Sequence, residues 1–516
     1  RPKVVKVDTV PGKLGWVRAL TAIGVIALGA CHEGRVRLEL SAPAAAELDP
    51  QRGAESLTLV ALAEGREVYA STIDVPARGE ALGFGEVPVR DELWFEVRAT
   101  AAAGRVVGFG RATEAVDVND DEEVRVAMEL RRPFAYLAGA DSLVVVDATR
   151  EPGEDYVTTM VVGGPVRGVA GSRDGAELVV VTDASVRLVS TSTHAALAGE
   201  VPLPSAPFAF AISDDGRWAA VSHRTAPEGL SIIDLQVLRD GAALAPAFVA
   251  IERPGAVGIG GGVAWVLKDP LDSFFCGGTS SVVSVPLDAP AAAPPIPLTA
   301  RAGTLAVDPA SGTAIVSVGC ASEVVAIDAA GGTPRPVYAA PGVGALTIAR
   351  GRLWMTGHVE GPDAHLSIID MGLDGSDPRT RALPSTEERA IAVALEEAGQ
   401  DGEIRLTADL HTAFALSVLP DGAHVAILEI AAHIGEAAGD AGGGRPIVPE
   451  MQLLTYEYQL VRLDTGLDAQ RLRLSCTITW EPGALLDDFR CGRVPGQDDS
   501  PVAFPASDLS VLYGSR

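Results

Sequence analysis

Four cysteines in the second half of the chain are the residues whose chemistry is easiest to anticipate from their number and spacing. An even number of cysteines in an oxidising compartment predicts two disulfides, for which three connectivities are possible. We expect the first two to pair because each follows the second strand of a neighbouring repeat, and the last two to pair because they flank one short loop. Metal ligation is the alternative, although no Cys-x-x-Cys spacing or nearby histidine pair supports it. The four residues are Cys276, Cys320, Cys476 and Cys491.

A fifth cysteine, Cys31, lies near the N-terminus, where Arg18 is followed by an apolar run at 19–28 and then by Gly29 and Ala30. A charged region, a short apolar region and small residues are the order of a cleaved export signal. The apolar run is too short to span a bilayer, which needs about 20 residues. A buried cysteine in an ordinary apolar strand is the alternative interpretation.

Residues 28–31, Leu-Gly-Ala-Cys, resemble the lipobox of bacterial lipoproteins. The resemblance implies cleavage before Cys31 and lipidation of its thiol and its new amino group, so that residues 17–30 are the signal peptide. His32 follows where the family's best-known rule for inner-membrane retention would require Asp, which favours the outer membrane. The expected location is therefore export with a lipid anchor on the outer membrane, facing the periplasm or the cell surface.

Residues 1–16 fit a signal peptide poorly, because such a peptide should begin just before Arg18. Val17 would serve as an alternative start codon. Three of the only four lysines in the chain, Lys3, Lys6 and Lys13, precede it. This break in composition predicts that residues 1–16 are upstream sequence outside the natural translation product.

The bulk composition restricts both the fold class and the partners. The 516 residues include 56 glycines and 35 prolines, and together with alternating apolar residues these numbers predict a turn-rich, all-β chain. The formal net charge is −27. Such an acidic surface repels phosphate backbones, so we expect no nucleic-acid partner.

Residues 32–131 are expected to form a β-sandwich. About 100 residues hold six short alternating segments separated by Gly, Pro and Asp clusters, which is the pattern of two packed antiparallel sheets. The pattern resembles the immunoglobulin-like or transthyretin-like spacers of secreted proteins. The segments are 36–40, 57–63, 68–72, 93–99, 106–112 and 124–130.

Residues 134–516 contain a weak repeat of two short strands joined by a tight turn, best developed at Phe134–Asp147. Its second strand ends in an apolar residue and Asp, and most endings recur 40 to 54 residues apart. Several strands per unit at this period predict a β-propeller. Asp-Gly pairs between the strands supply the positive φ angles of tight hairpins. The repeat resembles the YVTN type of surface and lactonase-like propellers, and this resemblance implies the fold class alone.

The first unit lacks an innermost strand, because Phe134 already belongs to a second strand. Residues 501–504 resemble innermost strands, so the C-terminal tail is expected to complete the first blade and to close a seven-bladed ring. Eight blades are the alternative. The long interval between Asp370 and Asp464 holds two further strand–turn–strand candidates, one of them Ile391–Leu406, for which we prefer a helix.

We assign no catalytic, metal-binding or cofactor-binding residue from the sequence. The chain has no Cys-x-x-Cys-His, no glycine-rich phosphate loop after a strand and no Gly-x-Ser-x-Gly. His358 with His365, and His424 with His433, are interpreted as loop residues. The expected innermost strands are mainly apolar, with Arg167 and Asp308 as exceptions.

Three functions remain as hypotheses. The first is a membrane-anchored lipoprotein whose propeller is a binding or scaffold surface for an envelope or extracellular protein or a glycan. The alternatives are a lactonase-like or other hydrolytic propeller enzyme and a structural subunit of an envelope assembly. Long insertions are expected to collect on one face of the ring and to form the binding surface. They are 268–281, 385–409, 431–451 and 481–500.

Overall fold

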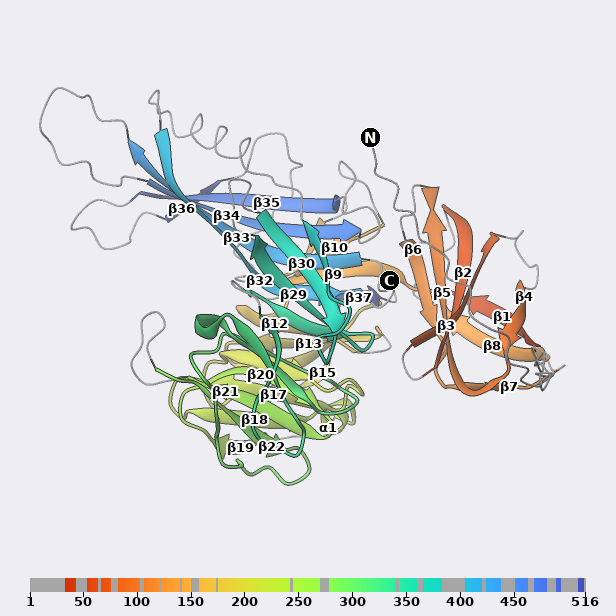
Figure 1. The fold of residues 1–516 in the computed structure, drawn as a ribbon, viewed down its shortest axis with the longest axis horizontal. Helices are drawn as coiled ribbons and strands as arrows, with labels where there is room; N and C mark the ends of the chain where they lie inside the picture. The colour runs from red at the N-terminus through yellow and green to blue at the C-terminus, as the bar shows by residue number, and fades with distance from the viewer. Residues whose placement is uncertain are drawn as a thin grey trace, which may run out of the picture.

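The structure is a computed structural model, and it divides into an N-terminal two-sheet unit and a β-propeller (Figure 1). From residue 429 onward, and at 404–415, it describes the backbone alone. The described residues are 33–42, 53–63, 66–75, 82–102, 106–120, 123–139, 142–149, 157–172, 175–241, 245–269, 278–339, 343–359, 365–382, 404–419, 424–437, 451–462, 468–479, 489–492 and 509–514.

The N-terminal unit consists of two sheets that share one hydrophobic core. Val36 and Val126 from the first sheet and Leu59, Phe95 and Val97 from the second are buried together. Strand β1 runs parallel to β8, whereas the other pairings are antiparallel. The immunoglobulin-like or transthyretin-like assignment stays a prediction. The first sheet has the order β4 (Leu82–Pro88), β1 (Glu33–Ser41), β8 (Glu123–Glu129), and the second β3 (Arg66–Asp74), β2 (Ala54–Ala63), β5 (Arg90–Ala101), β6 (Val106–Arg111), with β7 (Val116–Val118) paired to β5.

The all-β propeller prediction is confirmed. Among the described residues, antiparallel sheets follow one another along the chain, and the innermost strands of neighbouring sheets are in contact around the ring. From the innermost strand outward, the first three sheets are β37 (Leu509–Gly514), β9 (Arg132–Ala138), β10 (Ser142–Asp147), β11 (Val157–Val161); β12 (Val166–Gly171), β13 (Glu177–Thr182), β14 (Ser185–Ser190), β15 (Ala196–Pro202); and β16 (Ala209–Ile212), β17 (Trp218–His223), β18 (Gly229–Asp234), β19 (Ala247–Ala250).

The remaining sheets continue the same order. They are β20 (Pro254–Gly260), β21 (Val263–Lys268), β22 (Ser281–Pro286), β23 (Ile296–Pro297); β24 (Thr304–Val307), β25 (Ala314–Val318), β26 (Glu323–Ile327), β27 (Arg335–Ala339); β28 (Leu346–Ala349), β29 (Arg352–Val359), β30 (His365–Gly372), β31 (Arg379–Ala382); and β32 (Ile404–Val418), β33 (His424–Ala437), β34 (Met451–Arg462), β35 (Asp468–Thr479), β36 (Phe489–Gly492). Residues 383–403, which an eighth blade would use, lie outside the described residues.

The tight turns between first and second strands depend on glycine. Gly175, Gly216, Gly312 and Gly351 have φ angles between 67° and 71°. This left-handed region costs glycine nothing, whereas a Cβ would strain it. The predicted Asp-Gly and related turns therefore set the spacing of the repeat.

The C-terminal tail closes the ring, but it does so with a later segment than the sequence suggested. Strand β37 begins at Leu509 and pairs antiparallel with β9, with Leu512 opposite Phe134. Residues 501–504 lie outside the described residues. The register of this pairing depends on β9, which lies near the other end of the propeller part of the chain. The tail sequence alone therefore does not show which of its segments pairs.

The sheet β32–β36 differs from the others in strand length. Strands β32 and β33 have 15 and 14 residues, whereas the strands of the sheets from β12 to β31 have 2 to 8. Its blue strands extend past the ring in Figure 1. The predicted insertion bounds 385–409 and 431–451 were therefore too wide, because pairing continues from Ile404 and up to Ala437.

Candidate functional site

The alternation of strand direction gives the ring two faces. The turn face carries the short turns between first and second strands and the connections between third and fourth strands. The insertion face carries the connections between second and third strands and those between sheets. The strand order places all four predicted insertions at the insertion face, between β21 and β22, between β31 and β32, between β33 and β34, and after β35.

The described cysteines also belong to the insertion face. Cys320 lies in the short 3-10 helix η2 (Gly319–Ala321), between β25 and β26. Cys476 on β35 is directly opposite Cys491 on β36 in the backbone register. Cys31 and Cys276 lie outside the described residues. Lipidation of Cys31 and both disulfide pairings therefore stay predictions.

A group of side chains around one arginine, Arg224, lies on the insertion face, and the sequence did not suggest it. The Arg224 guanidinium, just after β17, stands 3.5 Å from the centroid of the Phe208 ring, just before β16. Its Nε donates to the carbonyl oxygen of Pro254 at 3.0 Å, and its Nη2 pairs with the carboxylate of Asp269. The Phe208 side chain is 50 % exposed. We call Arg224, Phe208 and Asp269 the Arg224 cluster.

A buried histidine supports the backbone beneath this cluster. His223 is fully buried, with Nδ1 2.9 Å from the carbonyl oxygen of Ser205 and Nε2 2.8 Å from the hydroxyl of Ser231. Burial lowers the pKa of the His223 imidazole, so the ring is neutral at neutral pH. A neutral ring needs one donor and one acceptor, and these two contacts fix the residue that precedes Arg224.

The two titratable exceptions of the inner strands do not converge. Arg167, at the insertion end of β12, pairs with Asp183, with Nε 2.5 Å from Oδ1. Asp308 lies in the turn after β24, where its Oδ2 accepts from the backbone N–H of Ser311 at 3.0 Å. Arg167 and Asp308 therefore each make a local contact, one in an ion pair and one in a turn. They lie at opposite ends of the inner strands.

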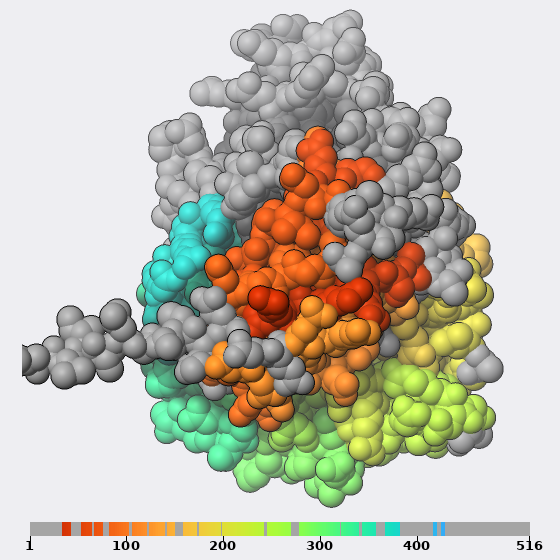
Figure 2. All heavy atoms as spheres, turned by 90° about the vertical axis from the view of Figure 1, so that its right-hand side faces the viewer, coloured from red at the N-terminus to blue at the C-terminus, as the bar shows by residue number. Residues whose placement is uncertain are grey.

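The turn face receives the N-terminal unit. Arg350, in the turn between β28 and β29, places Nη1 3.1 Å from Oε2 of Glu96 on β5. Glu96 is 2 % exposed, and burial raises the pKa of its carboxyl group although Arg350, Arg111 and Arg98 act in the opposite direction. In Figure 2 the N-terminal unit, in red and orange, lies in front, and coloured parts of the ring are visible around it.

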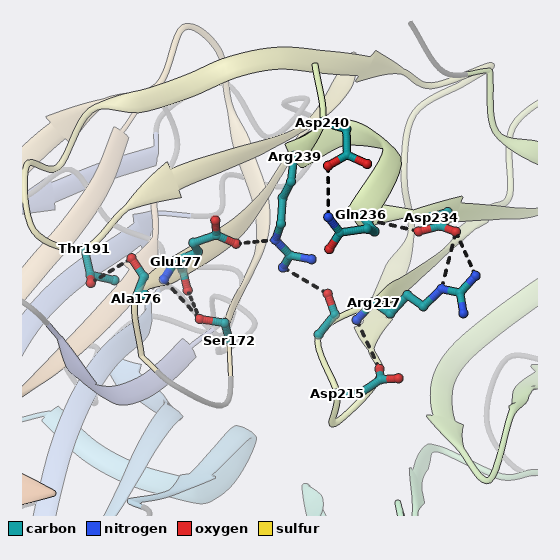
Figure 3. Close-up of polar contacts among 11 residues, drawn as sticks. Ser172, Ala176, Glu177, Thr191, Asp215, Arg217, Asp234, Gln236, Arg239 and Asp240 are labelled. Atoms are coloured by element: carbon teal, nitrogen blue, oxygen red, sulfur yellow. Dashed lines mark hydrogen bonds and ion pairs between the residues drawn. The ribbon is translucent and has the colours of Figure 1, made fainter. Parts of the chain in front are cut away.

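A second group of contacts on the turn face links two neighbouring sheets (Figure 3). Helix α1 (Leu235–Arg239) follows β18, and Asp234 caps it by accepting from the N–H of Gln236 at 3.0 Å. From its end, Arg239 reaches Oε2 of Glu177 in the preceding sheet at 2.7 Å and the carbonyl oxygen of Gly216 at 3.0 Å. Because Arg239 joins helix α1 to Glu177 of the preceding sheet, we call Arg239, Glu177 and Gly216 the inter-sheet clamp.

Few side chains that the structure describes are placed for metal binding or other chemistry. They contain no group of three or more His, Cys, Asp or Glu placed to hold a metal ion. Within the described ranges, no helix has the length and apolar character needed to cross a membrane. The histidine interpretation needs correction, because His358 lies in β29, His365 in β30, and His424 and His433 in β33. These strands extend further than the turn signals suggested.

The Arg224 cluster shows what reasoning from the sequence missed. Its members come from connections in two sheets, and they meet only because the ring brings those connections together. The available local signal was His223-Arg224 directly after an apolar strand. Nothing in the sequence identifies Phe208 or Asp269 as its partners.

Comparison with known proteins gives fold likeness only. No family model matches the chain, and no curated protein matches it. Among solved structures, hydrazine synthase of Kuenenia stuttgartiensis is similar over 52 % of this chain and 76 % of that chain, with 16 % identity and a TM-score of 0.37. A putative TolB of Agrobacterium tumefaciens (49 % and 90 %, 14 % identity, TM-score 0.31) and the Cps50 (Swd1) β-propeller domain of Myceliophteria thermophila (61 % and 93 %, 12 % identity, TM-score 0.38) are also similar.

Proposed function

We propose that this protein is a lipoprotein, anchored to the outer membrane through Cys31, whose insertion face binds an envelope or extracellular protein or a glycan. The observation that carries the proposal is the different use of the two faces. The turn face is in contact with the N-terminal unit through Arg350 and Glu96, while the long insertions all attach to the opposite face.

The order of the parts along the chain favours this orientation. A lipid on Cys31 would lie directly before the N-terminal unit, which begins with β1 at Glu33 and packs on the turn face. The anchor, the N-terminal unit and the ring would then follow one another away from the membrane. The insertion face would be the farthest part from the bilayer and the most accessible to a partner.

The Arg224 cluster supplies a suitable contact surface. An exposed aromatic ring stacked with an arginine offers apolar area, a cation and hydrogen-bond donors in one place, and aromatic residues and arginine are the residues enriched at protein interfaces. The pairing with Asp269 holds the guanidinium in position before a partner arrives, which lowers the entropy cost of binding.

The anchor is tested by replacing Cys31 with Ser and fractionating the cells. Acyl chains contribute about 0.8 kcal/mol per buried CH₂, so the loss of several chains should release the protein from the membrane fraction. A Cys31→Ser protein that still requires detergent for extraction would mean that the anchor lies elsewhere.

The binding face is tested by affinity capture from detergent-solubilised envelope, followed by mass spectrometry. The double variant Arg224→Ala, Phe208→Ala should lose captured partners by about tenfold or more, in line with a central interface contact. Arg217→Ala is the matched control, because Arg217 on the turn face also stacks on an aromatic ring, Trp218, and pairs with a carboxylate, Asp234. Equal loss in both variants, or in neither, would reject the insertion face as the binding site.

A further inference from the structure

The long antiparallel pair β32–β33 brings together three residues of types that can bind metal ions, two from β32 and one from β33. Its register is regular from Ala408 to Ala413, between two irregularities. Asp409 is directly opposite His433, and His411 is directly opposite Ala431. This stretch belongs to the part of the sheet that extends past the ring at the insertion face (Figure 1).

The strand period places all three residues on one face of the sheet. Residues two apart on a strand share a face, so Asp409 and His411 lie on the same face of β32. Residues directly opposite in an antiparallel pair also share a face, which adds His433. Opposite residues have Cβ atoms about 4.5 to 5.5 Å apart, and diagonal neighbours such as His411 and His433 about 7 to 8 Å. These separations are within the span of ligands to one ion.

The residue types match a recurring metal-ligand set. Imidazole nitrogens and carboxylate oxygens bind Zn²⁺ at about 2.0 to 2.2 Å, and imidazole suits divalent ions such as Zn, Cu, Fe and Ni. Two histidines with one carboxylate leave coordination positions open for water or another ligand. A paired sheet fixes all three Cα positions, so no loop must be ordered when the ion binds.

The two rows of this face continue across the neighbouring strands. The row of Asp409 and His433 runs through Leu453 and Thr477 to Arg490 on β36, and the row of His411 runs through Ala431, Thr455 and Ser475 to Gly492. Arg490 lies three strands beyond His433, at about 4.8 Å per strand, so the basic position in these rows is on the far strand of the sheet. The simpler alternative is that these residues bind no ion, and a metal titration distinguishes the two.

We propose that Asp409, His411 and His433 form a binding site for a divalent first-row transition metal ion. The site does not depend on lipidation of Cys31 or on a partner at the Arg224 cluster. The sequence alone did not suggest this site, because His411 and His433 are far apart along the chain. Only the register of β32 and β33 places His433 opposite Asp409.

The test uses the full chain in detergent, stripped with a chelator and titrated with Zn²⁺ by calorimetry and with Co²⁺ by visible absorption. The wild-type protein should bind one equivalent. His411→Ala and His433→Ala should each weaken binding about 100-fold or more, and Asp409→Asn about tenfold or more, because each removes a ligand. Binding should also weaken below about pH 6.5, where imidazole is protonated.

The controls separate this site from other ligands. His365→Ala removes a strand histidine of another sheet and should leave the affinity unchanged. Cys476→Ser should leave it unchanged as well, and the bound Co²⁺ should show no thiolate charge-transfer band. His433→Gln serves if His433→Ala fails to fold, which circular dichroism reports. Absence of stoichiometric binding by the wild-type protein, or wild-type affinity in the His411 and His433 variants, overturns the proposal.

Discussion

Arginine–carboxylate pairs occur on both faces of the ring, but their surroundings differ. On the turn face, Glu96 and Arg350 have side chains only 2 % and 20 % exposed, and the Arg132–Asp147 pair is similarly buried. On the insertion face, the side chains of Arg167 and Arg224 are 51 % and 37 % exposed. Breaking a buried pair leaves an uncompensated charge, whereas exposed pairs contribute little to stability. The buried pairs of the turn face should therefore contribute more to stability than the pairs of Arg167 and Arg224, and the exposed turn-face pair Arg217–Asp234 gives a comparison within one face.

The largest effect should follow from ending the chain after residue 508, which removes β37. Strand β9 would then present an unpaired edge, and β12 and β32 would lose their neighbour in the inner ring. We expect loss of cooperative thermal unfolding by calorimetry and aggregation in size-exclusion chromatography. A chain ending at residue 514 is the control; equal melting of the two chains would show that β37 does not close the ring.

The second effect concerns the contact between the N-terminal unit and the ring. Arg350→Met should cost up to about 3 kcal/mol of unfolding free energy, because it removes the nearer partner of the buried Glu96 carboxylate and leaves only the longer pair with Arg111, at 3.8 Å. The same substitution in a Glu96→Gln background should cost much less. Denaturant unfolding of the four proteins gives the coupling energy directly. Equal costs in both backgrounds would mean that the two side chains act independently.

The same carboxyl group predicts a pH dependence. Burial raises the pKa of Glu96 in the folded protein, so the stability linked to its proton is present at low pH and is lost as the pH rises through that raised pKa. The stability of the wild-type protein minus that of Glu96→Gln should therefore increase as the pH falls from neutral. A flat difference across this interval would contradict the raised pKa.

A smaller cost is expected at the inter-sheet clamp. Arg239→Ala should lower the unfolding free energy by about 1 to 2 kcal/mol, because it removes a charged hydrogen bond to Glu177 and another to Gly216. Arg217→Ala, in the same close-up in Figure 3, should cost less than about 1 kcal/mol, since the Arg217 side chain is 53 % exposed. Equal costs would remove the distinction between clamp and surface pair.

The smallest stability effect should occur on the insertion face. Arg224→Ala should shift the unfolding free energy by no more than about 1 kcal/mol, because the Arg224–Asp269 pair is partly solvated. Thermal melting of this variant beside Arg239→Ala measures the contrast between the two faces. If Arg224→Ala is the more damaging, the insertion face has a structural role instead.

The sequence predicted the features that depend on local repetition. The propeller followed from the period of its strand endings, and the turns at Gly216 and Gly312 followed from glycine's tolerance of positive φ. The position of β37 could not be read in the same way. Segment 509–514 becomes an innermost strand through its partner β9, which is almost a full ring away in sequence.

The features relevant to function are non-local for the same reason. Glu96 meets Arg350, and Phe208 meets Arg224, only after complete units have packed. The length of β32 and β33 was also missed, since a repeat defined by short strands gives no reason for one pair to continue. The juxtaposition of Asp409 with His433 is a direct result of that continuation.

The pairing of β37 with β9 also orders events in folding. Strand β9 is among the first parts of the ring to be made, yet its inner partner is the last described strand. During synthesis, the middle sheets can form from neighbouring segments while β9 keeps an open edge. Closing so long a loop is slow and adds to the entropy cost of folding. An interrupted chain would thus retain a gap in its first sheet, and quality-control proteases could recognise incompleteness there.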